Sequence, residues 1–336
     1  MKFLDALAGE AAWPPPLWLM RQAGRYLPEY REVRAKAGDF ISLCLNPALA
    51  EEVTLQPIRK FGFDAAILFS DILILPMALG QELRFAEGEG PRLPSLQDAA
   101  LLKPERAAAV YAPVIETVSR LRHSLPKDVA LIGFAGGPAT VACYMLDGQG
   151  GSFCRTKQLA YEQPAFVRQV LKVLSEATVE YLSAQVKAGA DCLMLFESWS
   201  GIFPPEQFRE FVIEPNRWIS DALKKRHPGM KIIGFPRLAG LGLGDYARDA
   251  GVDAVGLDSV TDIDAARAVC PPGMVLQGNL DPLLLKLGGT ALEEAVRGLM
   301  AKVKGHPHIF NLGHGITPDV PEAHVARLVE LVRQGG

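Results

Sequence analysis

Two arginines, Arg21 and Arg25, stand four residues apart directly after the apolar stretch Leu17–Met20. Each guanidinium is a planar fork that can bind a carboxylate or a phosphate through two parallel hydrogen bonds. Ala23 and Gly24 lie between them, and such small residues allow backbone N–H groups to approach a ligand closely. The segment therefore predicts a binding site for a ligand that carries several negative charges.

The same spacing has a simpler interpretation. Residues four apart lie on one face of a helix, where Arg21 and Arg25 could pair with Glu29 or Glu32 in solvent. On composition alone this interpretation is favoured, because arginines are mostly exposed. The two interpretations differ in whether the arginines have acidic partners.

Asp71 and His314 also follow apolar stretches. Asp71 comes after Ala65–Phe69 and is followed by further apolar residues, so it is expected away from open solvent. From spacing alone it fits a helix cap and a catalytic carboxylate equally well. His314 lies between two glycines after Ile309–Leu312, a place better suited to contact with a ligand than that of most structural histidines.

Two hydroxyl groups complete the candidates. Tyr144 follows the glycine-rich segment Gly133–Gly137 and could present its phenol from a helix, or serve as a half-buried core aromatic. Ser198 follows Phe196 and Glu197 at the end of another apolar stretch, where a Glu-Ser pair also fits ordinary capping.

The elements that position these residues are short apolar strands alternating with longer helices. The expected strands are Leu17–Met20, Ala65–Phe69, Val129–Phe134, Cys192–Phe196, Lys231–Phe235, Ala254–Leu257, Met274–Gln277 and Ile309–Leu312. The expected helices are Pro47–Phe61, Pro104–Leu125, Gln163–Lys187, Glu206–Arg226, Asp245–Asp249, Asp262–Val269, Ala291–Val303 and Glu322–Arg333. Continuous apolar strands are typical of parallel sheets that are buried on both faces.

Eight such units predict an α/β fold, a (β/α)₈ TIM barrel that forms a single domain over residues 1–336. An open doubly wound sheet is disfavoured because no G-x-G-x-x-G follows the first strand. In a barrel the active-site cleft lies at the C-terminal ends of the strands. The residues found there are Arg21, Asp71, Gly136-Gly137, Glu197-Ser198, Arg237, Asp258, Asn279–Asp281 and His314.

Composition limits the partners of the protein. A net charge of -3 gives no global attraction to nucleic acid or to an anionic membrane surface, so any anion site must be local. No apolar run reaches the length of a membrane span, and the first residues do not read as a secretory signal. Five scattered cysteines without a C-x-x-C pair favour a reducing, cytoplasmic location.

The ordered string from Pro16 to Arg25, with Trp18, Met20 and Gln22 inside it, resembles the amino-terminal signature of the uroporphyrinogen decarboxylase family. Further segments are similar to that family in the same order along the chain: Phe69–Leu73, Gly133–Met145, Phe196–Gly201, Gln277–Pro282 and Asn311–Ile316. We interpret Gln277–Pro282 mainly as a structured turn. Ala139 and Asp147 depart from the residues that the family generally carries.

The resemblance implies a reaction. Members of the family remove CO₂ from the four acetate side chains of uroporphyrinogen III and give coproporphyrinogen III, without a cofactor or a metal. It also implies a homodimer. The implied catalytic residues are Asp71, Arg21 and Tyr144. The implied substrate-binding residues are Arg21, Gln22, Ala23, Arg25, Asp71, Tyr144, Phe196, Ser198 and His314.

Two other functions remain to be distinguished. A corrinoid-linked methyltransferase of the same barrel type would need a zinc site built from His-x-Cys and a distant Cys, and no His-x-Cys occurs in the sequence. A non-catalytic tetrapyrrole carrier would keep the arginines and bind porphyrinogens without converting them.

Overall fold

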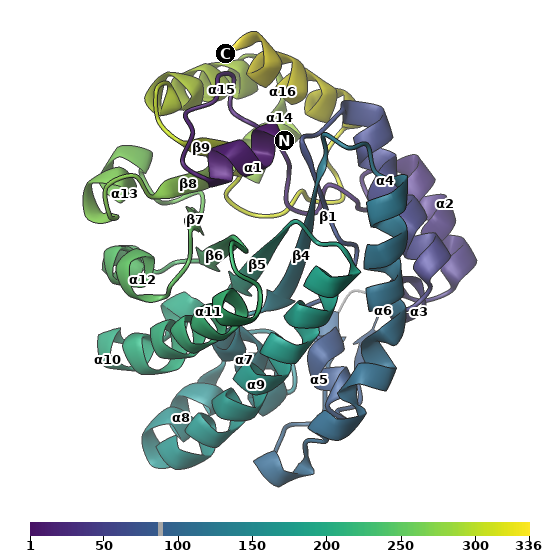
Figure 1. The fold of residues 1–336 in the computed structure, drawn as a ribbon, viewed down its shortest axis with the longest axis vertical. Coiled ribbons are helices and arrows are strands. Elements are labelled where there is room, and N and C mark those ends of the chain that lie inside the picture. The colour runs from purple at the N-terminus through teal and green to yellow at the C-terminus, as the bar shows by residue number, and fades with distance from the viewer. Residues whose placement is uncertain (87–89) are drawn as a thin grey trace.

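Parallel strands form one curved sheet at the centre of the molecule. The computed structural model describes residues 1–86 and 90–336. Within these residues, the sheet runs in the order β1 (Ala65–Ile67), β4 (Ala130–Gly136), β5 (Cys192–Glu197), β6 (Ile232–Pro236), β7 (Ala254–Gly256), β8 (Val275–Leu280) and β9 (His308–Leu312). Every neighbouring pair is parallel, and helices surround the strands (Figure 1).

Residues 16–20 close the barrel between its first and last strands. Leu17 forms a parallel bridge with Phe310 of β9, and the Phe310 N–H donates to the Pro16 carbonyl at 2.8 Å. On the other side, the Asp64 N–H donates to the Leu17 carbonyl at 2.9 Å. The segment therefore occupies the place of an eighth strand.

Side chains replace the strand ladder in this segment. The Leu19 N–H donates to Gln22 Oε1 at 3.1 Å, and the Met20 N–H donates to Asn311 Oδ1 at 2.9 Å. The expected strand Leu17–Met20 is thus in its expected place, but its pairing is limited to a single bridge because side-chain oxygens take up these two N–H groups.

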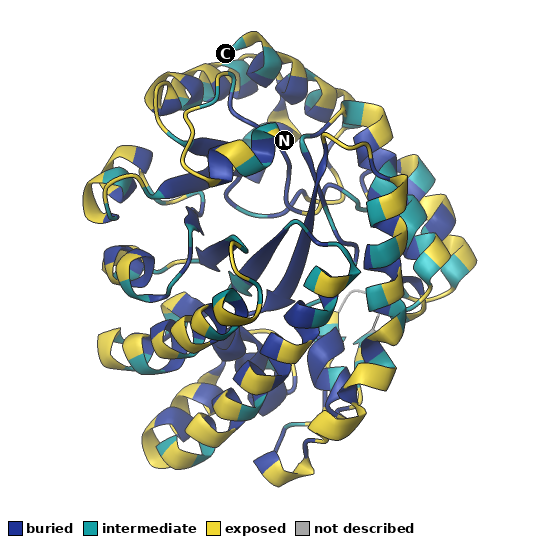
Figure 2. Cartoon of the chain, viewed as in Figure 1, coloured by how far each residue is buried: buried dark blue, intermediate teal, exposed yellow. Residues whose placement is uncertain are grey.

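Eight longer or shorter helices match the expected ones in position: α4 (Pro47–Phe61), α6 (Pro104–Ser124), α9 (Pro164–Ala188), α11 (Glu214–Arg226), α12 (Leu243–Asp249), α13 (Ile263–Val269), α15 (Gly289–Val303) and α16 (Glu322–Gln334). The first three begin with proline, whose fixed φ suits the first helical position. Their outward faces are exposed and the strands are buried (Figure 2).

Further elements were not anticipated as separate units. They are α1 (Lys2–Leu7), α2 (Pro28–Ala37), α3 (Phe40–Cys44), α5 (Ile74–Ala78), α7 (Pro138–Asp147), α8 (Cys154–Glu162), α10 (Pro205–Gln207), α14 (Pro282–Leu287) and the antiparallel pair of β2 (Arg84–Ala86) and β3 (Gly90–Arg92). Between α10 and α11 the helix continues through a π-helical stretch, Phe208–Ile213. There the Asn216 amide donates to the Val212 carbonyl at 2.7 Å.

The interpretation of Gln277–Pro282 as a turn was wrong. Residues 277–280 are the last four of the six residues of β8, because Asn279 and Leu280 continue the ladder opposite Asn311 and Leu312 of β9. Only Asp281 and Pro282 leave the sheet, and Asp281 caps α14 by accepting from the Leu283 N–H at 2.8 Å.

Candidate active site

The candidate residues lie at one edge of the barrel. Because all strands of the barrel are parallel, the residues that follow them meet at the same end. Arg21 follows the closing segment, Asp71 follows β1, Ser198 follows β5 and His314 follows β9. The geometry at this end decides which of them can act on one ligand.

Arg21 and Arg25 lie in a turn and not in a helix. Residues 21–27 form turns and bends, and α2 begins only at Pro28. Glu29 pairs with Lys60 at 3.0 Å instead of with either arginine. Both arginine side chains are exposed, as the simpler interpretation expected, but neither has an acidic partner within residues 1–86 and 90–336, so the helical pairing with Glu29 or Glu32 was wrong.

Gln22 holds this turn in place. Its buried amide accepts from the Leu19 N–H and donates to the Ala65 carbonyl at 3.1 Å, which ties the turn to β1. The Gln22 N–H donates to the Leu19 carbonyl, whereas the Ala23 N–H has no hydrogen-bond partner in the described part of the chain. Arg21 takes a positive φ of 61°, a strained conformation for a residue with a side chain. 

Gly315 makes room for Arg21. A Cβ atom at Gly315 would lie 2.3 Å from Arg21 Cδ and 2.6 Å from its Cγ. The arginine side chain therefore runs over the backbone of the loop after β9, next to His314. Burial and the positive charges of Arg21 and Arg237 lower the pKa of His314 to about 4. His314 is consequently a neutral imidazole near pH 7, able to accept one hydrogen bond and donate another.

Asp71 is a partly buried carboxylate with one committed oxygen. Its Oδ1 accepts from the Leu73 N–H at 2.8 Å, while Oδ2 has no hydrogen-bond donor in the described residues. Burial raises the pKa of Asp71, and the Leu73 N–H and the positive charge of Arg21 partly oppose this. The local capping-type bond and a free oxygen for a ligand thus coexist in the same side chain.

Tyr144 reaches the same region from α7. Trp199 Nε1 donates to the Tyr144 hydroxyl at 3.0 Å, and both rings pack against Phe153, with centroid distances of 5.6 Å and 4.9 Å. Burial and the charge of Asp71 raise the pKa of Tyr144, whereas the Trp199 bond and Arg21 lower it. Because Trp199 occupies an acceptor position, the Tyr144 O–H remains available as a donor.

Glu197 positions α7. Its fully buried carboxylate accepts from the Thr140 N–H and hydroxyl, both at 2.9 Å, and from Asn216 Nδ2 at 2.8 Å. The capping interpretation is therefore confirmed for Glu197, although the helix that it caps lies 57 residues earlier in the chain. Burial raises its pKa to about 7 against these hydrogen bonds.

Phe196 and Ser198 flank this carboxylate. The Phe196 ring packs edge-on against Phe134 and Phe235 at centroid distances of 5.5 Å and 6.0 Å. The Ser198 carbonyl accepts from Arg237 Nη1 at 3.5 Å, and its hydroxyl has no partner in the described residues. Asp147, one of the two residues that depart from the family pattern, accepts from the Thr156 N–H at 2.8 Å and so caps α8.

A cleft of about 630 Å³ opens at this edge of the barrel. Its lining includes Arg237, Ser259, Asp281, Leu283, His314 and Gly315. The positive charge of Arg21 lowers the pKa of both Asp71 and His314, and Arg237 also lowers that of His314; we call these four residues the strand-end cluster. The sequence places Arg237 at a strand end, but no motif there marks it as a site residue.

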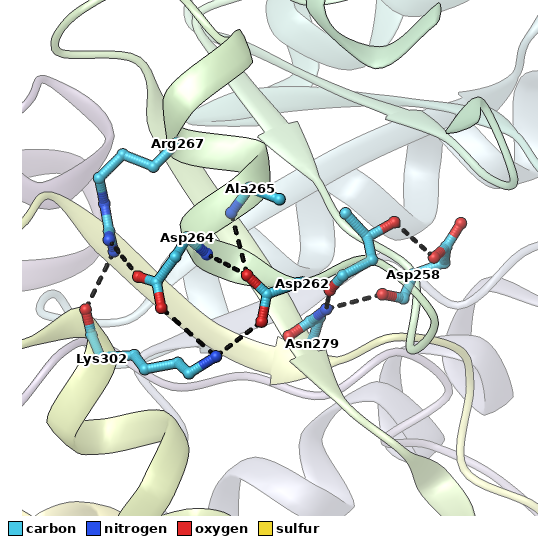
Figure 3. Close-up of polar contacts among 8 residues, drawn as sticks. Asp258, Asp262, Asp264, Ala265, Arg267, Asn279 and Lys302 are labelled. Atoms are coloured by element: carbon cyan, nitrogen blue, oxygen red, sulfur yellow. Dashed lines mark hydrogen bonds and ion pairs between the residues drawn. The ribbon is translucent and has the colours of Figure 1, made fainter. Parts of the chain in front are cut away.

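Other strand-end residues fix loops instead. Asp258 accepts from the Leu238 N–H and the Thr261 hydroxyl, and Asn279 Nδ2 donates to the Asp258 carbonyl at 2.7 Å. Close by, Lys302 bridges Asp262 and Asp264, and Asp264 also pairs with Arg267 (Figure 3). We call Asp262, Asp264, Arg267 and Lys302 the Asp262 corner.

Among residues 1–86 and 90–336, no group of three or more His, Cys, Asp or Glu side chains could hold a metal ion. No helix in the same residues is long and apolar enough to cross a membrane.

Comparison with known proteins places the whole chain in one group. The family profile described as uroporphyrinogen decarboxylase (URO-D) matches residues 1–335. A protein of Acidiphilium cryptum named uroporphyrinogen decarboxylase is 58% identical over 98% of this chain and 93% of its own length. One of the same name from Granulibacter bethesdensis is 55% identical over 98% of both.

Solved structures share the fold at much lower identity. A methyltransferase from Methanosarcina mazei superposes with a TM-score of 0.80 at 22% identity and covers 99% of this chain and 97% of that one. A B12-independent methionine synthase from Shewanella gives 0.56 at 11% identity, over 96% and 97% of the two chains. These likenesses show the α/β barrel fold.

Proposed function

The chain belongs to the uroporphyrinogen decarboxylase family, and on that premise we propose that the strand-end cluster is where it performs the reaction of the family. The protein is a carboxy-lyase of tetrapyrrole biosynthesis, which removes CO₂ from the acetate side chains of uroporphyrinogen III. The observation that carries this conclusion is similarity over nearly the whole chain, with 58% identity to a named relative. The methyltransferase structure resembles it in fold alone.

The chemistry needs an electron sink. Loss of CO₂ from a carbon attached to a pyrrole leaves an electron pair, which the protonated pyrrole ring accepts. Protonation of the resulting methylene carbon and loss of the added ring proton then give the methyl group. The substrate therefore supplies what a cofactor supplies in other decarboxylases, and we propose that none is required.

We propose that Asp71 faces the pyrrole N–H groups. Its Oδ2 is free in the described residues, and several N–H donors would favour the ionised carboxylate and offset the effect of burial on its pKa. An anion held there stabilises the pyrrole cation as it develops. The desolvated setting strengthens that interaction.

The arginines and the neutral groups have complementary roles in this proposal. Arg21 and Arg25, with the Ala23 N–H, bind peripheral carboxylates, and such charge-assisted hydrogen bonds contribute about 1.5–3 kcal/mol each. Arg21 also delivers the ring proton, which water then restores. His314 and Ser198 donate to further carboxylates. Tyr144 donates its O–H toward Asp71 or the substrate, and Gln22 and Phe196 shape the site around them.

The remaining proposals concern the whole molecule. The chain is one domain, because a single sheet runs through it from the segment before β1 to β9. All five cysteines are free thiols, which supports a cytoplasmic location. A homodimer is supported by exposed apolar side chains in the segments that follow β6, β7 and β8 at the cleft end, namely Leu238, Leu241, Val260 and Leu283. The dimer predicts that Leu241→Glu yields monomers in light scattering.

The test is anaerobic incubation of the protein with uroporphyrinogen III, followed by oxidation and chromatography of the porphyrins. Porphyrins with seven, six, five and four carboxylates are the expected products. Recovery of the eight-carboxylate porphyrin alone, from folded protein that binds it, would identify a carrier. Absence of both binding and conversion would return attention to the methyltransferase alternative.

A further inference from the structure

Arg237 is a cleft-facing guanidinium without an acidic partner. It follows β6, is half-buried and lines the cleft together with His314 and Gly315. No carboxylate among residues 1–86 and 90–336 forms an ion pair with it, whereas Lys286, in the same lining, is paired with Asp319 at 2.5 Å. An arginine that is left unpaired in a concave, partly desolvated place is suited to an anionic ligand.

The side chain is held in place by neutral groups. Its guanidinium lies over the Trp199 ring, 5.7 Å from the centroid, and Nη1 donates to the Ser198 carbonyl at 3.5 Å. The cation–π contact orients the guanidinium without neutralising it. Four of its N–H donors have no partner in the described residues, so a bidentate contact remains possible.

The backbone of Arg237 has a separate, structural task. Its N–H donates to the Glu197 carbonyl at 3.1 Å, and its own carbonyl accepts from the Ser200 hydroxyl at 2.8 Å. A side-chain substitution leaves these two bonds in place. Loss of the guanidinium can therefore be separated from loss of the loop.

We infer that Arg237 binds a peripheral carboxylate of the tetrapyrrole, on the β6 side of the cleft and near the carboxylate contacted by His314. This inference rests on the proposed function, since it takes the substrate to be a tetrapyrrole with acetate and propionate side chains. The inferred contact lies far along the chain from the Arg21–Arg25 turn. Arg237 follows β6, whereas that turn follows the segment that closes the barrel between β9 and β1.

The test compares Arg237→Gln, Arg237→Lys and Lys286→Gln with the unmodified enzyme. Three quantities are measured anaerobically: the KM and the kcat for uroporphyrinogen III, and the inhibition constant of coproporphyrinogen III, which has lost the acetates. Arg237→Gln is expected to raise KM about 10- to 100-fold with little change in kcat, as loss of a charged hydrogen bond predicts. Arg237→Lys keeps the charge without the fork and is expected to raise KM less.

The two ligands identify the carboxylate. If both the KM and the inhibition constant rise, Arg237 binds a propionate; if only the KM rises, it binds an acetate. Both results support the inference. Lys286→Gln is expected to change KM less than about twofold, because the Asp319 charge already balances Lys286.

Three results would overturn the inference. The first is an unchanged KM and inhibition constant in folded Arg237→Gln while the unmodified enzyme turns over, and the second is an equal effect of Lys286→Gln, which would indicate only the general field of the cleft. The third is a fall in kcat with constant KM, which would place the effect on Tyr144 through Trp199. If the unmodified protein does not convert uroporphyrinogen III, the proposed function is wrong, and the inference about Arg237 falls with it.

Discussion

The pKa shifts of the Asp262 corner favour charged side chains, whereas those of the strand-end cluster oppose them. In the Asp262 corner, Lys302 contacts both Asp262 and Asp264; these contacts lower the pKa of Asp262 and raise that of Lys302, so both charged forms are favoured. In the strand-end cluster, burial raises the pKa of Asp71 and, together with nearby arginines, lowers that of His314, so burial opposes the charged form of each.

This difference separates a structural region from the proposed functional one. Charged groups at the Asp262 corner satisfy one another, and they need no ligand. In the strand-end cluster Arg21 is exposed, whereas Asp71, Arg237 and His314 are partly buried and keep free donors or acceptors, an arrangement that suits a complementary ligand. Substitutions in the two regions should therefore affect different measurements, turnover in the cluster and stability in the corner.

Asp71→Asn is expected to have the largest effect. It keeps the shape of the side chain and removes the charge, so kcat should fall about 100- to 1,000-fold if Asp71 stabilises a developing cation. The free energy of unfolding near pH 7 should not fall, because burial disfavours the folded carboxylate there. Turnover assays measure the change in kcat, and urea titrations measure the free energy of unfolding. Near-normal turnover would show that Asp71 does not stabilise the cation.

Gly315→Ala should rank second. The new Cβ would displace the Arg21 side chain without removing its charge, and a shift of about 1 Å can reduce kcat/KM by about 100-fold. Gly298→Ala on α15 is the matched control, since open space surrounds that glycine. Equal activity of the two variants would show that the position of Arg21 does not matter.

Trp199→Phe should reduce kcat less, by about 5- to 10-fold. It keeps an aromatic ring beside Phe153 and removes the N–H that orients the Tyr144 hydroxyl, a bond whose loss is equivalent to about 1 kcal/mol. In the Tyr144→Phe background the same substitution should have no further effect on kcat. An additive effect in this double-mutant cycle would contradict a role through Tyr144.

The pH dependence of KM and of stability tests whether His314 stays neutral in the folded protein. With a folded pKa of about 4, His314 stays neutral from pH 8 to pH 5.5, so the ratio of KM between His314→Asn and the unmodified enzyme should change less than about twofold. Because the folded pKa lies below the unfolded value, His314 favours folding above pH 6.5, and this advantage is lost as the pH falls toward 4. Denaturation of both proteins across that range should reveal the loss; a KM ratio that changes near pH 6.5 would mean that His314 titrates there.

Asp262→Ala should have the smallest effect on turnover, namely none that can be measured. It removes the cap that accepts from the Asp264 and Ala265 N–H groups and the contact with Lys302, so the melting temperature should fall slightly. A change in KM instead would mean that the Asp262 corner and the cleft are coupled, and the contrast between them would have to be abandoned.

The sequence predicted the barrel more completely than the contacts inside it. Apolar runs placed the strands because each is buried on both faces, and proline marked the first residues of α4, α6 and α9. The sequence predicted a turn at residues 277–280, because the polar Asn279 interrupts the apolar pattern of the strand. The pairing of this segment with β9 is visible only in the structure. The short helices before α4 were not predicted, because their sequences show no strong hydrophobic periodicity.

Within the site, the motifs indicated residues but not their partners. The capping of α7 by Glu197 joins residues that are 57 positions apart, and the close passage of Arg21 over Gly315 joins the first and last strand ends. Such contacts depend on how the barrel closes, which local patterns do not encode. Arg237 illustrates the remaining difficulty, because only the structure shows that no acidic side chain in the described residues pairs with it.

The closing segment also sets when the site can exist during synthesis. Met20 is held by Asn311, and Trp18 Nε1 donates to Gln277 Oε1, contacts that span 291 and 259 residues. A ribosome adds about 5–20 residues per second, so the Arg21 turn waits roughly 15–60 s for the strand that completes it. A nascent chain therefore carries Arg21 and Arg25 long before the site that we propose for them is complete, and we expect catalysis to begin only when nearly the whole chain has emerged.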